Sequence, residues 1–190
     1  PGAPLRLDLS GNGLGDGDAE CLAALAPGLV GLGLTDNPAV SAAGLRALLA
    51  GLPALEDLDV SGCSIGAQGA HALAAAAPSL AALQVLSVQR TALGVEGTRL
   101  LLRAAAGMPA LRSLNIVANG QHAADWMSSV GAHVAAASTP PSSLRVLSVS
   151  CPEAELERAR ASLCGGPCRV LLVPNEQNNY NRPLFTGHVH

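Results

Sequence analysis

A short leucine phrase recurs along most of this chain, and the recurrence constrains the fold more than any other feature. The phrase is an aliphatic residue, two variable residues, leucine, one variable residue, another aliphatic residue, two variable residues and a small polar one. The closing positions are Asn12, Asn37, Cys63, Thr91, Asn119 and a degenerate Pro152. They lie 25, 26, 28, 28 and 33 residues apart. Such spacing is typical of solenoids, in which each unit buries its apolar face by stacking on its neighbours.

Each unit changes from strand-like to helix-like periodicity along its length. In the first unit, Leu7 and Leu9 alternate with polar residues, which predicts a strand with one apolar face. Leu22 and Leu25 follow at helical spacing, which predicts a helix whose apolar side meets the strand leucines. We expect the helices to end near prolines, at Pro27, Pro53, Pro78 and Pro109.

This pattern resembles the leucine-rich repeat, L-x-x-L-x-L-x-x-N/C-x-L, over about residues 4–151. The long unit with a helical second half is similar to the class of ribonuclease inhibitor and the Ran GTPase-activating proteins. The resemblance implies an α/β solenoid of about six to seven repeats, with a curved parallel sheet on the concave side and helices on the convex side. We expect the array to cover residues 1–173, with irregular fifth and sixth repeats at about 119–164. Residues 174–190 then form a non-repeat tail or cap.

Composition agrees with thin stacked layers and limits the classes of partner. Hydrophobic residues make up 49% of the chain but aromatic residues only 2%, so leucine, valine and alanine must fill the core. A net charge of −3 does not predict a basic surface for nucleic acid, and no apolar run is long enough for membrane insertion. The odd number of cysteines, five, favours a reducing, intracellular location, and the compartment stays open.

The acidic, glycine-rich loop after the first strand has some features of a calcium loop. Asp8, Ser10 and Asn12 match the first, third and fifth ligand positions of an EF-hand, but Ala19 stands where the bidentate glutamate belongs. The repeat already accounts for Asn12, and the glycines permit a sharp turn. We therefore expect this loop to turn the chain without binding calcium.

A second group of metal-binding residue types lies near the end of the chain. Cys164 and Cys168 precede His188 and His190, and together they have the composition of a zinc site. Their C-x₃-C and H-x-H spacings are unusual for zinc, so free thiols are the first expectation. A metal site and a disulfide between the two cysteines stay open as alternatives.

Catalysis finds little support in the sequence. His122 and His133 lie near Asp125 in the irregular fifth repeat, but no serine or cysteine nucleophile is fixed beside them. This sequence contains no motif that matches the functional residues of the Ran GTPase-activating proteins. We therefore expect no enzyme activity, no catalytic residue, no metal and no cofactor.

The outward residues of the strands are the candidate binding surface, because helices on one side leave the other side of the sheet open. The predicted partner-binding residues are Asp8, Asp36, Glu56, Asp57, Asp59, Val85, Ser87, Gln89, Arg90, Arg112, Asn115, Arg145 and Ser148. Their acidic members fall in the first three repeats and their arginines in the last three. At about 4.8 Å per strand, roughly 15 Å separates the two charge centres, beyond a Debye length of about 8 Å. This predicts two poles that act separately.

The sequence therefore predicts a non-enzymatic protein-binding module or scaffold subunit, within a larger assembly, whose partner is another protein. The resemblance implies an alternative, a regulator of a GTPase or a hydrolase. Tyr180 and Phe185 are the candidate docking residues of the tail. The tail either caps its own array or reaches another subunit.

Overall fold

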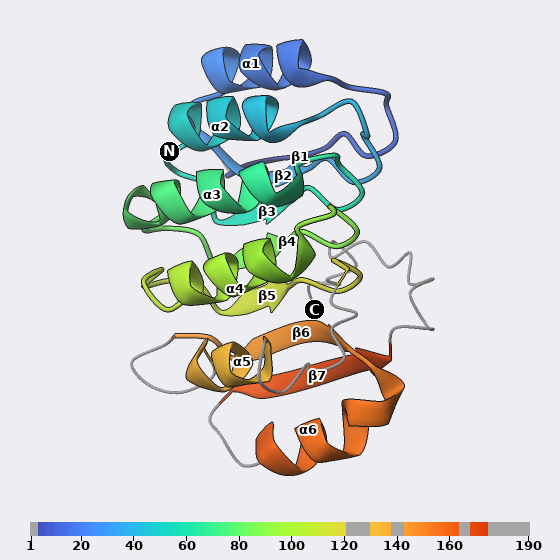
Figure 1. Cartoon of the computed structure of the whole chain (residues 1–190). Helices are drawn as coiled ribbons and strands as arrows, with labels where there is room; N and C mark the ends of the chain where they lie inside the picture. Colours follow the sequence, from blue (N-terminus) through green and yellow to red (C-terminus); the bar gives the residue numbers. More distant parts are fainter. Residues whose placement is uncertain (1–3, 121–129, 138–142, 164–167, 175–190) are drawn as a thin grey trace, which may run out of the picture.

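A computed structural model describes residues 4–120, 130–137, 143–163 and 168–174. In these residues strands and helices alternate (Figure 1). The strands are β1 (Leu5–Asp8), β2 (Leu29–Gly33), β3 (Asp57–Asp59), β4 (Val85–Ser87), β5 (Ser113–Asn115), β6 (Val146–Cys151) and β7 (Arg169–Pro174). The helices are α1 (Asp16–Leu25), α2 (Ala42–Gly51), α3 (Gly66–Ala76), α4 (Gly94–Ala105), α5 (Ala132–Ala137) and α6 (Leu156–Leu163). Two short 3₁₀ turns, Ala77–Ser79 and Glu153–Glu155, complete the described elements.

The strands form one parallel sheet whose spatial order is the sequence order, β1 to β7. Figure 1 shows the helices stacked on one face of this sheet. The predicted leucine of each phrase falls in a single row that crosses the sheet: Leu7, Leu32, Leu58, Leu86, Leu114 and Leu147. From Leu32 onward these side chains are buried, because each lies between two neighbouring strands and a helix. The α/β solenoid predicted from the repeat is confirmed.

Buried asparagines tie each unit to the one before it. The Asn37 amide nitrogen donates to the carbonyls of Leu9 (3.0 Å) and Leu34 (2.9 Å), and its oxygen accepts from the backbone of Asn12 (3.2 Å) and Leu14 (2.9 Å). One fully buried side chain thereby satisfies backbone groups of two units at the point where the strand ends. Asn119 repeats the arrangement with the carbonyls of Val88 and Ile116.

Cysteine and threonine replace asparagine in the two units between, with fewer hydrogen bonds. The Cys63 thiol donates to the Leu34 carbonyl at 3.3 Å, and the Thr91 hydroxyl donates to the Val88 carbonyl at 2.7 Å. Burial raises the pKa of the Cys63 thiol to about 11, so it stays a neutral donor at physiological pH. Asn119 also ties Thr91 to the next unit, because its Oδ1 accepts from the Thr91 backbone nitrogen at 3.1 Å and lies 3.0 Å from the hydroxyl.

The residue before each of these positions adopts a left-handed backbone conformation. Its φ is +67° at Gly11, +56° at Asp36, +72° at Gly62, +52° at Arg90 and +60° at Ala118. The sharp turn from strand to helix therefore uses the same backbone conformation in the first five units, including the units without glycine. Non-glycine residues adopt this conformation at a cost of about 1–2 kcal/mol, which the stacked units must offset.

A carboxylate joins the first two helices. Asp16 of α1 accepts hydrogen bonds from the Ser41 backbone (2.7 Å), the Ser41 hydroxyl (2.6 Å) and the Gly44 backbone (3.0 Å). These bonds, led by the Ser41 hydroxyl, lower the pKa of Asp16. Gly44 permits the close approach, since a Cβ there would lie 2.5 Å from Oδ1 of Asp16.

The helix ends and the irregular repeats agree with the sequence in part. Proline follows the end of α1, α2 and α4, whereas Pro78 lies inside the 3₁₀ turn that extends α3. In the fifth repeat only the short helix α5 lies between β5 and β6 among the described residues. Three of the predicted features, His122, Asp125 and the tail residues 175–190, lie outside the described residues.

Replacing Asn37 with alanine tests the ladder. Asn37→Ala leaves buried carbonyl and N–H groups without partners, and we expect it to lower the free energy of unfolding by about 3 kcal/mol. The matched control is Asn12→Ala, because Asn12 is exposed and its amide donates only to the Ser10 carbonyl. We expect this control to cost under about 0.5 kcal/mol. Urea denaturation followed by circular dichroism measures both, and equal losses would contradict the ladder.

Candidate protein-binding face

The side of the sheet opposite the helices carries seven of the thirteen predicted binding residues in two straight rows. One row runs through Arg6, Gly31, Asp57, Val85, Ser113, Val146 and Arg169. The next runs through Asp8, Gly33, Asp59, Ser87, Asn115, Ser148 and Leu171. The alignment predicted for these residues is confirmed, because parallel strands in one register place equivalent residues side by side.

The degree of exposure along these rows differs from the prediction. Asp8, Arg112 and Arg145 are exposed as expected, but Asp59, Ser87 and Gln89 are buried, with exposed fractions of 3%, 0% and 9%. Side chains on neighbouring strands form hydrogen bonds with one another instead of extending into solvent. The hydroxyl oxygens of Ser61 and Ser87 are 2.9 Å apart, and Ser61 also accepts from the Gln89 backbone. The prediction that the whole inner ribbon is bare is therefore wrong for these residues.

Arg6 neutralises part of the acidic pole. Its guanidinium donates to Glu56 at 3.0 Å and forms an ion pair with Asp57. These carboxylates belong to the region of β3, two strands away from Arg6. Gly31 of β2 lies between, and a Cβ there would come within 2.8 Å of the Arg6 side chain. The missing side chain lets arginine cross the intervening strand.

Arg90 forms a second pair of the same kind at the other end of the strands. It donates to Asp36 at 2.9 Å, across Gly62, and both charged side chains remain partly exposed. The prediction of two separate poles is wrong here, because Arg90 of the basic set is bound to Asp36 of the acidic set.

Asp59 is a buried carboxylate at the end of β3, in the third repeat. It accepts a hydrogen bond from the Ser61 backbone at 2.9 Å, and Asn115 accepts the same bond from Val117 in the equivalent place. Burial raises the pKa of Asp59, against the opposing effect of hydrogen bonds from Ser61. Asp59 is therefore a structural carboxylate that closes a turn at the end of β3.

Three exposed arginines lie near one another at the start of β5, β6 and β7, and we call them the arginine row. Arg112 and Arg145 directly precede Ser113 and Val146, and Arg169 pairs with Val146, one register position further on. Arg112, Arg145 and Arg169 follow one another on adjacent strands. The Arg145 backbone donates to the Arg112 carbonyl and the Arg169 backbone to the Arg145 carbonyl, both at 2.7 Å. Within residues 4–120, 130–137, 143–163 and 168–174, no carboxylate pairs with these guanidiniums. The sequence prediction missed Arg169, which the register of the sheet places in line with Val146 and Ser113.

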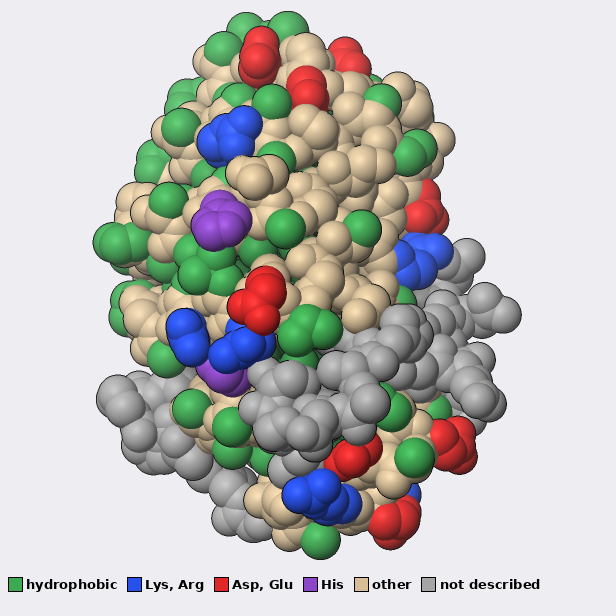
Figure 2. Space-filling view, in the orientation of Figure 1, with side chains coloured by type: hydrophobic (Ala, Val, Ile, Leu, Met, Phe, Trp, Pro, Cys, Tyr) green, Lys and Arg blue, Asp and Glu red, His purple; other side chains and the backbone are tan. Residues whose placement is uncertain are grey.

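The charged residues on the helix-covered face are scattered over several helices instead of forming a row (Figure 2). Arg99 pairs with Glu96 at 2.9 Å on α4. His133 of α5 lies near Arg103 and Arg99, and its pKa is lowered first by burial and then by these two cations. Glu96 opposes this lowering of the pKa, and Nδ1 of His133 has no hydrogen-bond partner among the described residues.

Metal-ligating residue types do not converge in the described part of the chain. No group of three His, Cys, Asp or Glu side chains there could hold a metal ion. In the loop compared with an EF-hand, Oδ1 of Asp8 accepts from the backbone and hydroxyl of Ser10. Cys168 is buried at the start of β7, whereas Cys164, His188 and His190 lie outside the described residues.

Two comparisons with known proteins agree with this geometry, and a third is negative. A family model described as Leucine Rich repeat matches residues 5–23 and 52–74. The leucine-rich repeat-containing protein LegL7 from Legionella pneumophila has a similar solved structure, with a TM-score of 0.53 and 16% identity. The match covers 90% of this chain and 56% of that one, so this chain spans little more than half of LegL7. The search of curated proteins gives no match.

These matches confirm the leucine-rich repeat that the sequence resembles, and with it the fold. The class of ribonuclease inhibitor and Ran GTPase-activating proteins is consistent with the matching family model. Proteins with this repeat are typically protein-binding modules. In the described residues, no helix has both the length and the apolar character required to cross a bilayer.

The raised pKa of Asp59 predicts a pH-dependent stability. Between the pKa of Asp in the unfolded state, about 3.9, and the raised pKa in the folded state, the folded state binds more protons than the unfolded state. The free energy of unfolding therefore falls as the pH rises through this window. The variant Asp59→Asn reproduces the geometry of Asn115 without a titrating carboxyl group. We expect it to remove this decrease in the free energy of unfolding, which is at most about 1.4 kcal/mol per pH unit in that window. Urea denaturation from pH 4 to pH 8 measures the difference between the two chains.

Two results check this interpretation of Asp59. A constant stability difference between Asp59→Asn and the unchanged chain over the whole pH range would show that Asp59 ionises freely. Asp59→Ala lacks the acceptor for the Ser61 backbone, and we expect it to lose about 1–3 kcal/mol at every pH.

Proposed function

We propose that this leucine-rich-repeat solenoid is a non-enzymatic interaction module or scaffold subunit that binds a protein partner through the helix-free face of its sheet. The observation that carries the proposal is the row of Arg112, Arg145 and Arg169. These side chains are exposed, adjacent and without a carboxylate partner in the described residues. An array of unpaired like charges costs folding energy through repulsion, and a partner of opposite charge relieves that cost.

The charge pattern supports an acidic partner segment at this end of the face. At the other end, Arg6 and Arg90 already occupy Glu56, Asp57 and Asp36. Those three carboxylates have internal partners, whereas the arginine row has none among the described residues. Charge complementarity of this kind orients a partner and speeds its association.

The middle of the face supplies contact area with little charge. Val85, Ser113 and Val146 form the outward row there, and each is partly exposed. Short side chains on adjacent strands make a smooth surface about 4.8 Å per strand in width. We infer that a partner segment lies across these strands, with its acidic residues directed to the arginine row.

A reducing environment remains part of the proposal. The described cysteines, Cys21, Cys63, Cys151 and Cys168, are free thiols. Burial raises the pKa of the Cys151 thiol to about 11, so this thiol is unreactive at neutral pH. Buried free thiols support an intracellular location more than a disulfide-forming one.

Charge reversal in the arginine row tests the proposal. The variant is Arg112→Glu with Arg145→Glu, and the matched control is Arg46→Glu with Arg103→Glu on the helix-covered face, which changes the net charge equally. Each chain is used as bait in extract from the native source, and retained proteins are quantified by mass spectrometry. We expect a partner that the unchanged chain and the control retain and that the row variant loses.

The retained partner is then purified, and its dissociation constant is measured with each chain at two salt concentrations. We expect the row variant to bind at least about tenfold more weakly, with a smaller salt dependence than the control. The proposal fails if both charge-reversed chains retain the same proteins with equal affinity. Comparable melting temperatures of the two variants show that the row variant does not lose binding because it unfolds.

A further inference from the structure

The helix-free face of the sheet divides into an exposed half and a buried half. At the amino ends of the strands, the row from β3 to β7 is at least partly exposed: Asp57, Val85, Ser113, Val146 and Arg169. Residues four positions further along a strand point to the same side of the sheet. We call four of them the buried row, because Ser61, Gln89, Val117 and Ser150 have exposed fractions of 3%, 9%, 5% and 1%.

The core beneath the sheet does not account for the burial of this row. Val88 and Ile116, one residue earlier on each strand, belong to the apolar core, whereas Val117 is no part of it. The described helices lie on the opposite face of the sheet (Figure 1), and no described strand lies over the buried row. Hydrogen bonds between neighbouring strands suffice for the small Ser61 side chain. The larger Gln89 and Val117 side chains require a cover from outside the described elements.

Strand β7 brings the chain to the same end of the sheet. Its last residue, Pro174, pairs with Cys151, which directly follows Ser150 of the buried row. Residues 175–190 come next, and they contain the only tyrosine and the only phenylalanine of the chain, together with four asparagines and a glutamine. Aromatic rings suit an apolar contact such as Val117, and amides suit the hydroxyl and amide groups of the other three residues. The composition of this tail therefore matches the buried row.

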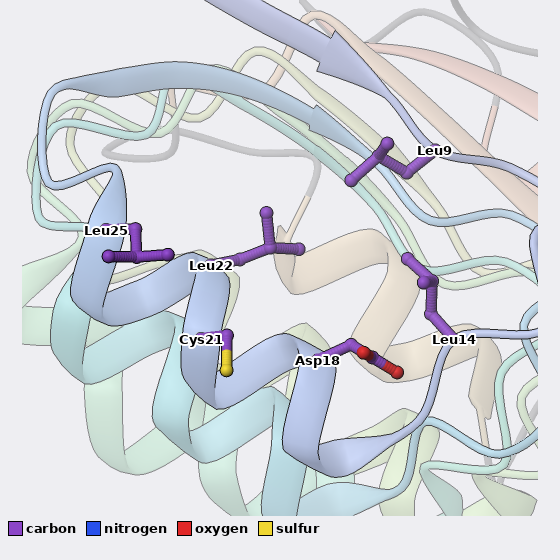
Figure 3. Close-up of a pocket in the computed structure, with 6 residues that line it drawn as sticks. All are labelled: Leu9, Leu14, Asp18, Cys21, Leu22 and Leu25. Atoms are coloured by element: carbon purple, nitrogen blue, oxygen red, sulfur yellow. The ribbon is translucent and has the colours of Figure 1, made fainter.

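The reach of the tail also favours the buried row over the apolar hollow on the first unit. Figure 3 shows that hollow, which is lined by Leu9 and by residues of α1 that include Leu22. β1 lies six strand spacings from β7, about 29 Å, whereas the six residues from Pro174 to Tyr180 span at most about 21 Å. Val117 follows β5, two spacings from β7, about 10 Å. Tyr180 therefore reaches Val117 but not the hollow.

We propose that residues 175–190 turn back over the helix-free face and cover the buried row, with Tyr180 and Phe185 against Val117. The occupant is the tail of the same chain, so this half of the face needs no partner protein to cover it. The exposed half and the arginine row stay open, and a protein partner has only that half of the face to bind. The proposal stands on burial and reach and does not rest on the proposed function.

Two cysteine probes on one repeat test the proposal in the full chain. Gln89→Cys places a thiol in the buried row, and Val85→Cys places a matched thiol four residues earlier in the exposed half. Each probe is combined with the unchanged tail, with the double variant Tyr180→Ser and Phe185→Ser, and with the polar control Asn178→Ser and Asn181→Ser. Peptide mass spectrometry measures the rate of alkylation by iodoacetamide at each probe, separately from the exposed native Cys21.

We expect the loss of both aromatic rings to speed alkylation of Gln89→Cys at least about tenfold, and the asparagine control to leave it at the parent rate. Val85→Cys should react at one rate with all three tails, because the tail does not cover it. Equal rates of Gln89→Cys with all three tails would overturn the proposal, since the row would then be open or covered by another segment such as residues 121–129. Protection that disappears on dilution, together with a dimeric mass by light scattering, would also overturn it, because the tail of a second copy would then be the cover.

Nitration of Tyr180 tests the same contact without any substitution. Tyr180 is the only tyrosine of the chain, so the yield of nitrotyrosine reports on this residue alone. We expect Tyr180 to react at least about tenfold more slowly in the full chain than in a synthetic peptide of residues 175–190. Equal rates would overturn the proposal. This comparison decides the question even if the serine variant unfolds, which faster alkylation of Val85→Cys would reveal.

Discussion

The structure depends on one constraint, that no unit can bury its own leucines or satisfy its own backbone without a neighbour. Asn37 makes this explicit, because one buried amide serves carbonyls and N–H groups of two units at once. The leucine rows add the apolar part of the same contact. Stability in such a stack is a sum of units and of interfaces between neighbours. Each interface therefore matters more than any one helix or strand.

Glycine decides where charges meet on the helix-free face. Arg6 reaches Asp57 across Gly31, and Arg90 reaches Asp36 across Gly62. In both places the missing side chain on the middle strand lets an arginine span two strand spacings. Glu56, Asp57 and Asp36 are consequently bound in internal ion pairs, whereas the described residues provide no carboxylate partner for the arginine row at β5 to β7.

The sequence by itself determined the period, the leucine rows, the ladder of Asn37 and Asn119, and the alignment of outward residues. These follow from local periodicity, because a repeated phrase forces equivalent residues into equivalent places. Only the tertiary structure decided which charges are paired and which polar residues are buried. Arg6 and Asp57 are 51 residues apart in the sequence and meet only through the register of three strands. The burial of Asp59 likewise depends on side chains of neighbouring strands, whose directions no single repeat contains. The same holds for Arg112, Arg145 and Arg169, which have no carboxylate partner among the described residues.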